Sequence, residues 1–134
     1  MNNSLKCLLI EDDVDDQEIF SMAVHKIDAE IECIISKDGV QAIKLLEADQ
    51  SLKPDYIFID VNMPKMDGME CLRRIKELPQ AAQSIIFMFS TSSEPTFVDK
   101  SKILGANGFI VKPPALSLLT EKLKEIFKTN RAAR

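Results

Sequence analysis

An apolar stretch that ends abruptly at an aspartate constrains the fold of this chain more than any other feature. The run from Tyr56 to Ile59 has the length of a buried strand, and Asp60 ends it. Pro64 and Gly68 prevent the strand from continuing and predict a loop that leads into a helix. Carboxylates at the carboxyl ends of buried strands lie where open α/β sheets carry out their chemistry. Asp60 is therefore the predicted nucleophile.

The remaining apolar segments alternate between strand and helix patterns. Short apolar runs predict four further strands, at residues 6–10, 31–36, 84–90 and 108–112. Apolar residues at helical spacing predict five helices, over about residues 14–27, 40–46, 68–78, 95–104 and 116–127. Strand–helix units joined by right-handed crossovers require a parallel sheet with helices on both faces. We expect an α/β, flavodoxin-like (βα)5 sandwich with strand order 2-1-3-4-5.

Finer features of this sheet also follow from the sequence. Residues 84–90 form the most apolar segment and are expected at the sheet centre, whereas Glu32 gives its strand a charge that suits a position near the edge. Ser92 and Ser93 precede Pro95, which predicts a hydroxyl cap at the start of the fourth helix. The chain is expected to form one domain over residues 1–134, with its core at about 5–128 and a frayed tail at 129–134.

Composition excludes several classes of function. The net charge of −4 argues against nucleic acid as the main partner, because phosphate binding requires a basic face. No apolar run has the length of a membrane span, and the first four residues do not resemble a signal peptide, so a cytoplasmic location is expected. The three scattered cysteines lack metal-ligand spacing and are read as small apolar fillers.

An acidic cluster follows the first predicted strand. Asp13, Asp15 and Asp16 are read as the cap and first turn of the following helix, where acids favour the helix dipole. Glu11 and Asp12 instead lie at the strand end, facing the expected position of Asp60. Two like charges about 4 Å apart repel by roughly 4 kcal/mol at an effective dielectric constant of 20, so the acids of such a group either raise each other's pKa or require a cation. Carboxylate oxygens predict a Mg²⁺ site.

Two further polar residues end strands at the same edge of the predicted sheet. Ser90 ends the fourth strand and Lys112 ends the fifth. A hydroxyl and an ammonium beside an aspartate and Mg²⁺ can orient and neutralise the oxygens of a transferring phosphoryl group. Taken singly, each residue is ordinary at a strand end, so the prediction depends on their convergence. Because Lys112 precedes Pro113, a cis peptide bond that would turn the lysine inward is left open.

These motifs together resemble the receiver domain of bacterial two-component response regulators, in particular stand-alone receivers of the chemotaxis-regulator type. Residues 60–68 resemble the phosphoacceptor loop of that family, and residues 8–12 resemble its acidic first strand. Ser90 and residues 105–113 resemble its later motifs. The resemblance spans about residues 5–128, with the motifs in the order and at the spacing of the family.

The resemblance implies a role for each site residue. Asp60 would accept a phosphoryl group from a sensor histidine kinase or a histidine phosphotransfer protein. Asp12 and Asp60 would bind Mg²⁺, with Mn²⁺ as a substitute, while Glu11 would act through water and Asn62 through its backbone carbonyl. Ser90 and Lys112 would contact the phosphate. Ser90 would also act with Phe109 as a switch pair, in a family that often has Thr and Tyr at these two positions.

The resemblance also implies how a signal would leave the domain. No DNA-binding domain follows the fifth helix in this sequence, so the output is expected to pass to a partner protein or along a phosphorelay. The expected output face is the fourth helix, fifth strand and fifth helix, and the protein is expected to be a monomer or a weak dimer through that face. It would be a switch that gains and loses its own phosphoryl group, not an enzyme that turns over a substrate.

Three alternatives compete with this interpretation. A phosphatase of the haloacid dehalogenase type requires an acid two residues after the nucleophile, where this chain has Asn62. A flavodoxin-like flavin protein requires an anion-binding loop after the first strand, where the acids would repel phosphate. A receiver-shaped module that is never phosphorylated would lack the acids or the lysine. His25 is interpreted as a solvated surface residue, and Met22 as a helix residue at the edge of the core that could help to dock a kinase.

Overall fold

The strands form one parallel sheet in the predicted order. The structure is a computed structural model that describes residues 5–91 and 94–133. Its five strands are β1 (Lys6–Ile10), β2 (Glu32–Ser36), β3 (Tyr56–Asp60), β4 (Ile85–Ser90) and β5 (Gly108–Val111). They lie in the order β2-β1-β3-β4-β5 and every neighbouring pair is parallel. The prediction of a flavodoxin-like α/β fold is confirmed.

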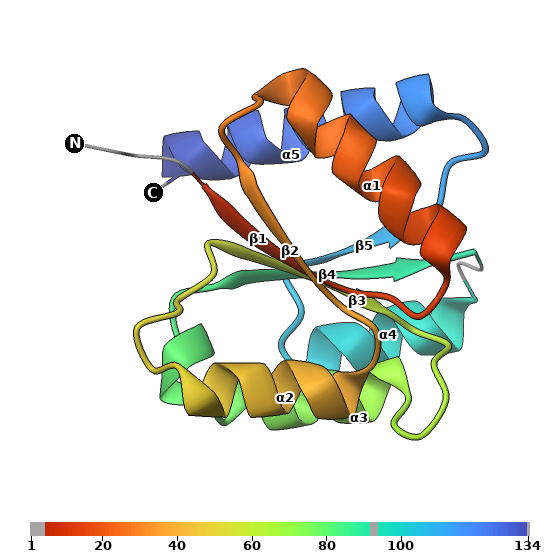
Figure 1. The fold of residues 1–134 in the computed structure, drawn as a ribbon. Helices are drawn as coiled ribbons and strands as arrows, with labels where there is room; N and C mark the ends of the chain where they lie inside the picture. The colour runs from red at the N-terminus through yellow and green to blue at the C-terminus, as the bar shows by residue number, and fades with distance from the viewer. Residues whose placement is uncertain (1–4, 92–93, 134) are drawn as a thin grey trace.

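Helices cover both faces of this sheet (Figure 1). Their bounds are α1 (Val14–Ile27), α2 (Gly39–Ala48), α3 (Gly68–Lys76), a short 3-10 turn η1 (Pro79–Ala81), α4 (Pro95–Ile103) and α5 (Leu116–Ala133). In Figure 1, α1 and α5 lie on one side of the sheet, and α2, α3 and α4 lie on the other. The connection from β1 to β2 runs in one direction along the sheet, and the connections from β2 to β3, β4 and β5 run in the other. Because every crossover is right-handed, the two directions place their helices on opposite faces.

Successive residues of each strand pack into two separate hydrophobic cores, one on each face of the sheet. Every residue of β3 is buried, and Phe58 packs with α1 and α5 while its neighbours Ile57 and Ile59 pack with α2 and α3. This alternation follows from the pleat of a strand, whose side chains point to opposite faces in turn. On the α1 and α5 side, Phe58 lies edge-on to Phe20, with 4.9 Å between the ring centroids. The doubly covered β3 carries Asp60 at its end, so the proposed nucleophile belongs to a strand that is buried along its whole length.

Three helices begin with an aspartate that caps them. Asp13, Asp38 and Asp67 each accept a hydrogen bond from the backbone N–H three residues later, at 3.0, 2.8 and 2.9 Å. Such caps satisfy N–H groups that have no partner within the helix. Each cap lies just beyond the carboxyl end of a strand, so α1, α2 and α3 all start at the edge of the sheet where the acids gather.

Several finer expectations differ from the structure. The middle strand is β3, whereas β4 lies one place towards β5, so the prediction that 84–90 occupies the centre is wrong. The expected hydroxyl cap of α4 falls on residues 92–93, which lie outside the described residues. Helix α5 extends to Ala133, and the fraying of residues 129–134 stays a prediction. Strand β2 does lie at the edge.

None of the helices in the described part of the chain is both long enough and apolar enough to span a bilayer.

Gly105 offers a direct test of backbone conformation in the fold. Its φ of +103° lies in the region that favours glycine, and an added Cβ would lie 2.8 Å from Cε of Lys76. We expect Gly105→Ala to lower the free energy of unfolding by about 1–2 kcal/mol, measured by urea titration. Because the end of a lysine side chain moves easily, most of this loss should persist when Lys76→Ala is added. Full recovery in the double variant would contradict a backbone cause.

Candidate functional site

Three acids from neighbouring strands converge at the carboxyl edge of the sheet. Glu11 directly follows β1 and Asp60 ends β3, the strand that pairs with β1. Among the described residues, carboxylate oxygens of Glu11, Asp12 and Asp60 all lie within 4.8 Å of one another. Glu11 is fully buried and Asp60 is 5% exposed, whereas Asp12 faces solvent. The group is therefore buried at its base and open at Asp12, as a site for a partly hydrated cation would be.

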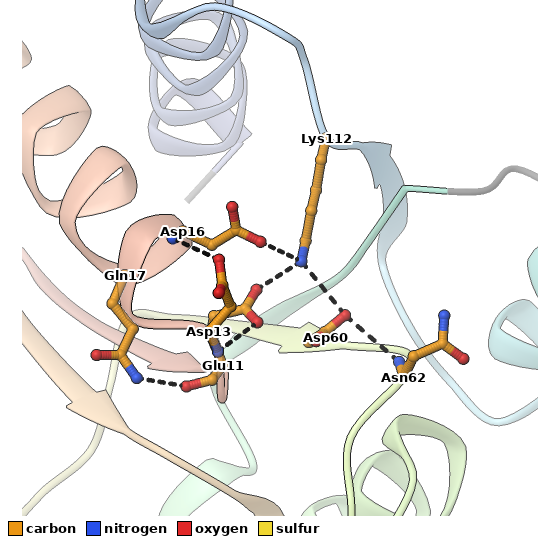
Figure 2. A network of polar contacts seen from close by, with 7 residues as sticks. All are labelled: Glu11, Asp13, Asp16, Gln17, Asp60, Asn62 and Lys112. Carbon is orange, nitrogen blue, oxygen red and sulfur yellow. Dashed lines mark hydrogen bonds and ion pairs between the residues drawn. The ribbon is translucent and has the colours of Figure 1, made fainter.

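Lys112 reaches into this acidic group from the end of β5. Its Nζ lies 2.7 Å from Oε1 of Glu11 and 3.6 Å from Oδ1 of Asp60. It also lies 2.8 Å from Oδ2 of Asp16, in the first turn of α1. Figure 2 shows the lysine descending between Asp16 and Asp60, with Glu11 below it. The Phe89 ring, with its centroid 5.2 Å from Nζ, adds a weaker cation–π attraction.

Burial and like charge perturb the titration of these groups. Burial raises the pKa of Glu11 to about 7, and the charge of Asp60 adds to this rise while Lys112 opposes it. Burial also raises the pKa of Asp60, although Lys112 again opposes the change. The pKa of Lys112 is raised overall, because hydrogen bonds to Asp16 and Glu11 outweigh the effect of its burial. Burial thus disfavours the charged forms of both acids, and Lys112 offsets only part of that effect.

The donor set fits a hard divalent cation. Four carboxylates gather here in the described chain: those of Glu11, Asp16 and Asp60 lie against the ammonium of Lys112, and that of Asp12 converges with Glu11 and Asp60. Three of them present oxygens that converge, and oxygen ligands of this kind suit Mg²⁺ or Mn²⁺. A divalent cation at this point would favour the charged forms of Glu11 and Asp60, whose pKa values burial raises.

The loop between β3 and α3 is packed tightly against Asp60. The backbone N–H of Asn62 donates to Oδ1 of Asp60 at 3.4 Å. A Cβ added to Gly68 would lie 2.3 Å from the backbone oxygen of Asp60, so only glycine fits at that position. Lys65 has a positive φ of 68° and pairs with Asp38 at 3.8 Å. These contacts fix the loop that the sequence predicted to carry the metal-binding carbonyl of Asn62.

Ser90 lies at the same edge of the sheet as this group, whereas Phe109 lies two residues before the β5 partner of Ser90. Ser90 is fully buried at the end of β4, and its backbone oxygen accepts a hydrogen bond of 2.7 Å from the N–H of Lys112. Phe109 lies in β5, half-buried against the core on the α2, α3 and α4 side. The peptide bond between Lys112 and Pro113 is trans, so the cis option left open by the sequence is not realised. The lysine points inward without it.

Two residues were missed by sequence reasoning. Asp16 was assigned to helix chemistry alone, yet it forms one of the two short contacts of Lys112. Gln17 donates from its side chain to the backbone oxygen of Glu11 at 2.7 Å. The signal that could have found Asp16 is its place three residues after the cap Asp13, in the turn of α1 nearest the strand ends. His25 and Met22 are both exposed, the former as predicted, and Met22 by 50%.

Comparison with known proteins places this geometry in a family. The model of the response regulator receiver domain matches residues 7–124. Response regulator Rcp1 of Synechocystis sp. is 30% identical over 125 residues, covering 90% of this chain and 80% of Rcp1. A protein-glutamate methylesterase/protein-glutamine glutaminase of Desulfotalea psychrophila is 33% identical over 96% of this chain, which spans only 36% of that protein.

Solved structures agree with these matches. The phosphorylated cyanobacterial phytochrome response regulator RcpA has a TM-score of 0.83 and 30% identity, with 92% of this chain and 91% of RcpA covered. The Mn²⁺-bound form of Rcp1 has a TM-score of 0.79 and 28% identity, with 91% of each chain covered. The motifs, the fold and the family match therefore lead to one conclusion: this chain belongs to the response regulator receiver domains, which act as switches in two-component signalling.

Proposed function

We propose that Asp60 is the phosphoacceptor of this receiver, and that the donor is a phosphohistidine on a sensor kinase or a phosphotransfer protein. The observation that carries this proposal is the position of Lys112, whose Nζ lies 3.6 Å from Oδ1 of Asp60 within the acidic group. The protein acts as a switch that carries its own phosphoryl group, not as an enzyme that turns over a substrate.

The chemistry requires little beyond positioning and charge. A carboxylate oxygen of Asp60 forms a bond to phosphorus, the bond from phosphorus to the imidazole nitrogen breaks, and its electron pair remains on the imidazole. Negative charge spreads over the phosphoryl oxygens in the transition state, where Lys112 and the hydroxyl of Ser90 stabilise it. A divalent cation, Mg²⁺ or Mn²⁺, supplies further positive charge when held by Glu11, Asp12, Asp60 and the backbone carbonyl of Asn62.

The phosphoryl group would signal through Ser90 and Phe109. Ser90 lies beside the end of β5, because its backbone oxygen bonds Lys112, and Phe109 lies three residues before that lysine in β5. The face formed by α4, β5 and α5 exposes Ile103 by 84%, Val111 by 46% and Leu118 by 55%. We infer that this face meets the downstream protein or forms a weak dimer, since exposed apolar side chains favour contact with a partner.

Phosphorylation can be tested with a small acyl phosphate donor and Mg²⁺. We expect intact-mass analysis to show one added phosphoryl group per chain, and peptide mapping after reductive trapping to locate it on Asp60. Chelation of the metal should abolish the gain in mass, because the acids then remain uncompensated. Asp60→Asn is the matched control, since it keeps the shape of the side chain and removes the nucleophilic charge.

Two results would contradict the proposal. Equal labelling of the wild-type chain and Asp60→Asn would show that the phosphoryl group sits elsewhere. Continuous release of inorganic phosphate from a phosphomonoester at many turnovers per chain would favour a phosphatase instead of a switch.

A further inference from the structure

Two carboxylates hold the ammonium of Lys112 at short distance. Its Nζ donates a hydrogen bond to Oδ2 of Asp16 at 2.8 Å and forms an ion pair with Oε1 of Glu11 at 2.7 Å. Its distance of 3.6 Å to Asp60 is longer than a hydrogen bond. An ammonium has three donors, so one N–H remains for an oxygen that arrives on Asp60.

Asp16 stands apart from the other acids around this lysine. The carboxylates that converge as a metal-binding group in the described chain belong to Glu11, Asp12 and Asp60, and Asp16 is outside that group. Its own backbone N–H donates to Oδ2 of Asp13 at 3.0 Å, so the start of α1 fixes its place. Its side chain is 32% exposed, whereas that of Glu11 is fully buried. Asp16 thus contacts the lysine from outside the group that could hold a metal.

Asp16 attracts the ammonium of Lys112 away from Asp60. Figure 2 shows Asp16 and Asp60 on opposite sides of Nζ. Without Asp16, the carboxylates in contact with the ammonium would be Glu11 and Asp60, and attraction would draw Nζ onto Oδ1 of Asp60. A closed ion pair at that oxygen would occupy the third N–H and reduce the availability of the oxygen that attacks phosphorus. The ring of Phe89, 5.2 Å away, attracts the ammonium too weakly to prevent this.

We propose that Asp16 is a positioning residue for phosphoryl transfer, which holds Lys112 back from Asp60 and leaves one N–H for the incoming phosphoryl oxygen. This inference rests on the proposed function and concerns the rate of the same reaction. It assigns Asp16 a role beyond the first turn of α1, through a contact between residues 96 positions apart in the chain.

The test compares three variants at saturating Mg²⁺ and acyl phosphate donor. Asp16→Asn removes the charge and keeps the shape, and Asp16→Glu restores the charge. Asp15→Asn is the matched control, because Asp15 is an exposed acid in the same turn of α1. We expect labelling of Asp16→Asn to be slower by about tenfold, since small misplacements of a charged group cost that much or more. Asp16→Glu should recover most of the rate, and Asp15→Asn should label like the wild-type chain.

Metal affinity supplies a second readout. Titration of Mn²⁺ should show that Asp16→Asn weakens binding no more than Asp15→Asn does, because Asp16 acts on the lysine. Three results would overturn the role of Asp16 and leave the proposed function standing: wild-type labelling rates in Asp16→Asn, equal slowing in Asp15→Asn, or Mn²⁺ binding that Asp16→Asn weakens far more than Asp15→Asn does. A wild-type chain that takes up no phosphoryl group would overturn the proposed function, and this inference with it.

Discussion

Replacing Lys112 by alanine is expected to slow phosphoryl uptake on Asp60 by about 10²–10³-fold, the usual loss when one charge-stabilising donor is removed from a reaction site. The ammonium is the single cation in contact with Glu11, Asp16 and Asp60 in the described chain, and its side chain is 12% exposed. Few other groups could therefore take its place. The measurement is the rate of labelling by a small acyl phosphate, followed by intact mass.

The same variant should bind Mn²⁺ more tightly. Lys112 and a divalent cation are both attracted by Glu11 and Asp60, and the two positive charges repel each other across a short distance. Removal of the ammonium makes the net charge of the site more negative, and this favours binding of the metal. Electron paramagnetic resonance of free Mn²⁺ during titration can detect the change. Slow labelling combined with tighter metal binding would show that Lys112→Ala removes a transition-state contact, because a disrupted site would also bind the metal less tightly.

Lys128→Ala is a suitable control for this experiment. Lys128 is an exposed lysine of α5, so its removal changes the net charge by the same amount without touching the acidic group. It should leave both labelling and metal affinity unchanged. The role given to Lys112 would be wrong if Lys112→Ala labelled at the wild-type rate, or if Lys128→Ala lost as much.

Local patterns in the sequence were sufficient for the sheet and for the ends of its strands. The bounds of β1 and β3 were predicted without error, because each is an apolar run that stops at a charged residue. The alternation of strand and helix, together with the handedness of the crossovers, predicted a parallel sheet with helices on both faces, and the flavodoxin-like order was one that these rules allow. Because the carboxyl ends of parallel strands lie at the same edge of a sheet, these rules place Glu11 and Asp60 together without knowledge of side-chain packing.

Contacts made across the fold could not be predicted in the same way. The ion pair of Lys112 and Asp16 depends on the rotation of α1 about its axis, which is set by packing of Phe20 against Phe58 and Phe89. The sequence placed Asp16 in the first turn of the helix but not the direction in which it points. The position of β4 beside the centre was missed for a related reason, because apolar content measures burial on both faces, and β3 and β4 are both interior strands.

Gly68→Ala is expected to damage both the fold and the reaction. The added Cβ would meet the backbone oxygen of Asp60 at 2.3 Å and the Cα of Val61 at 2.7 Å, and backbone atoms cannot move aside as a flexible side chain can. The start of α3 would have to shift away from the end of β3. Overpacking of this kind costs about 1–3 kcal/mol in the free energy of unfolding. Because the shift moves the carboxylate of Asp60 relative to Lys112, labelling should slow by about 10²-fold.

Gly39→Ala provides the matched control, because the two glycines occupy the same place in their helices. Gly39 begins α2 after the cap Asp38, and Gly68 begins α3 after the cap Asp67. A Cβ on Gly39 would approach the sulfur atoms of Cys71 and Met66 at 3.1 Å, and these side-chain atoms can give way. Urea titration and the labelling rate should therefore change far less in Gly39→Ala than in Gly68→Ala. Equal losses in the two variants would mean that glycine is required for helix initiation itself, and that the close approach of α3 to Asp60 does not position the carboxylate.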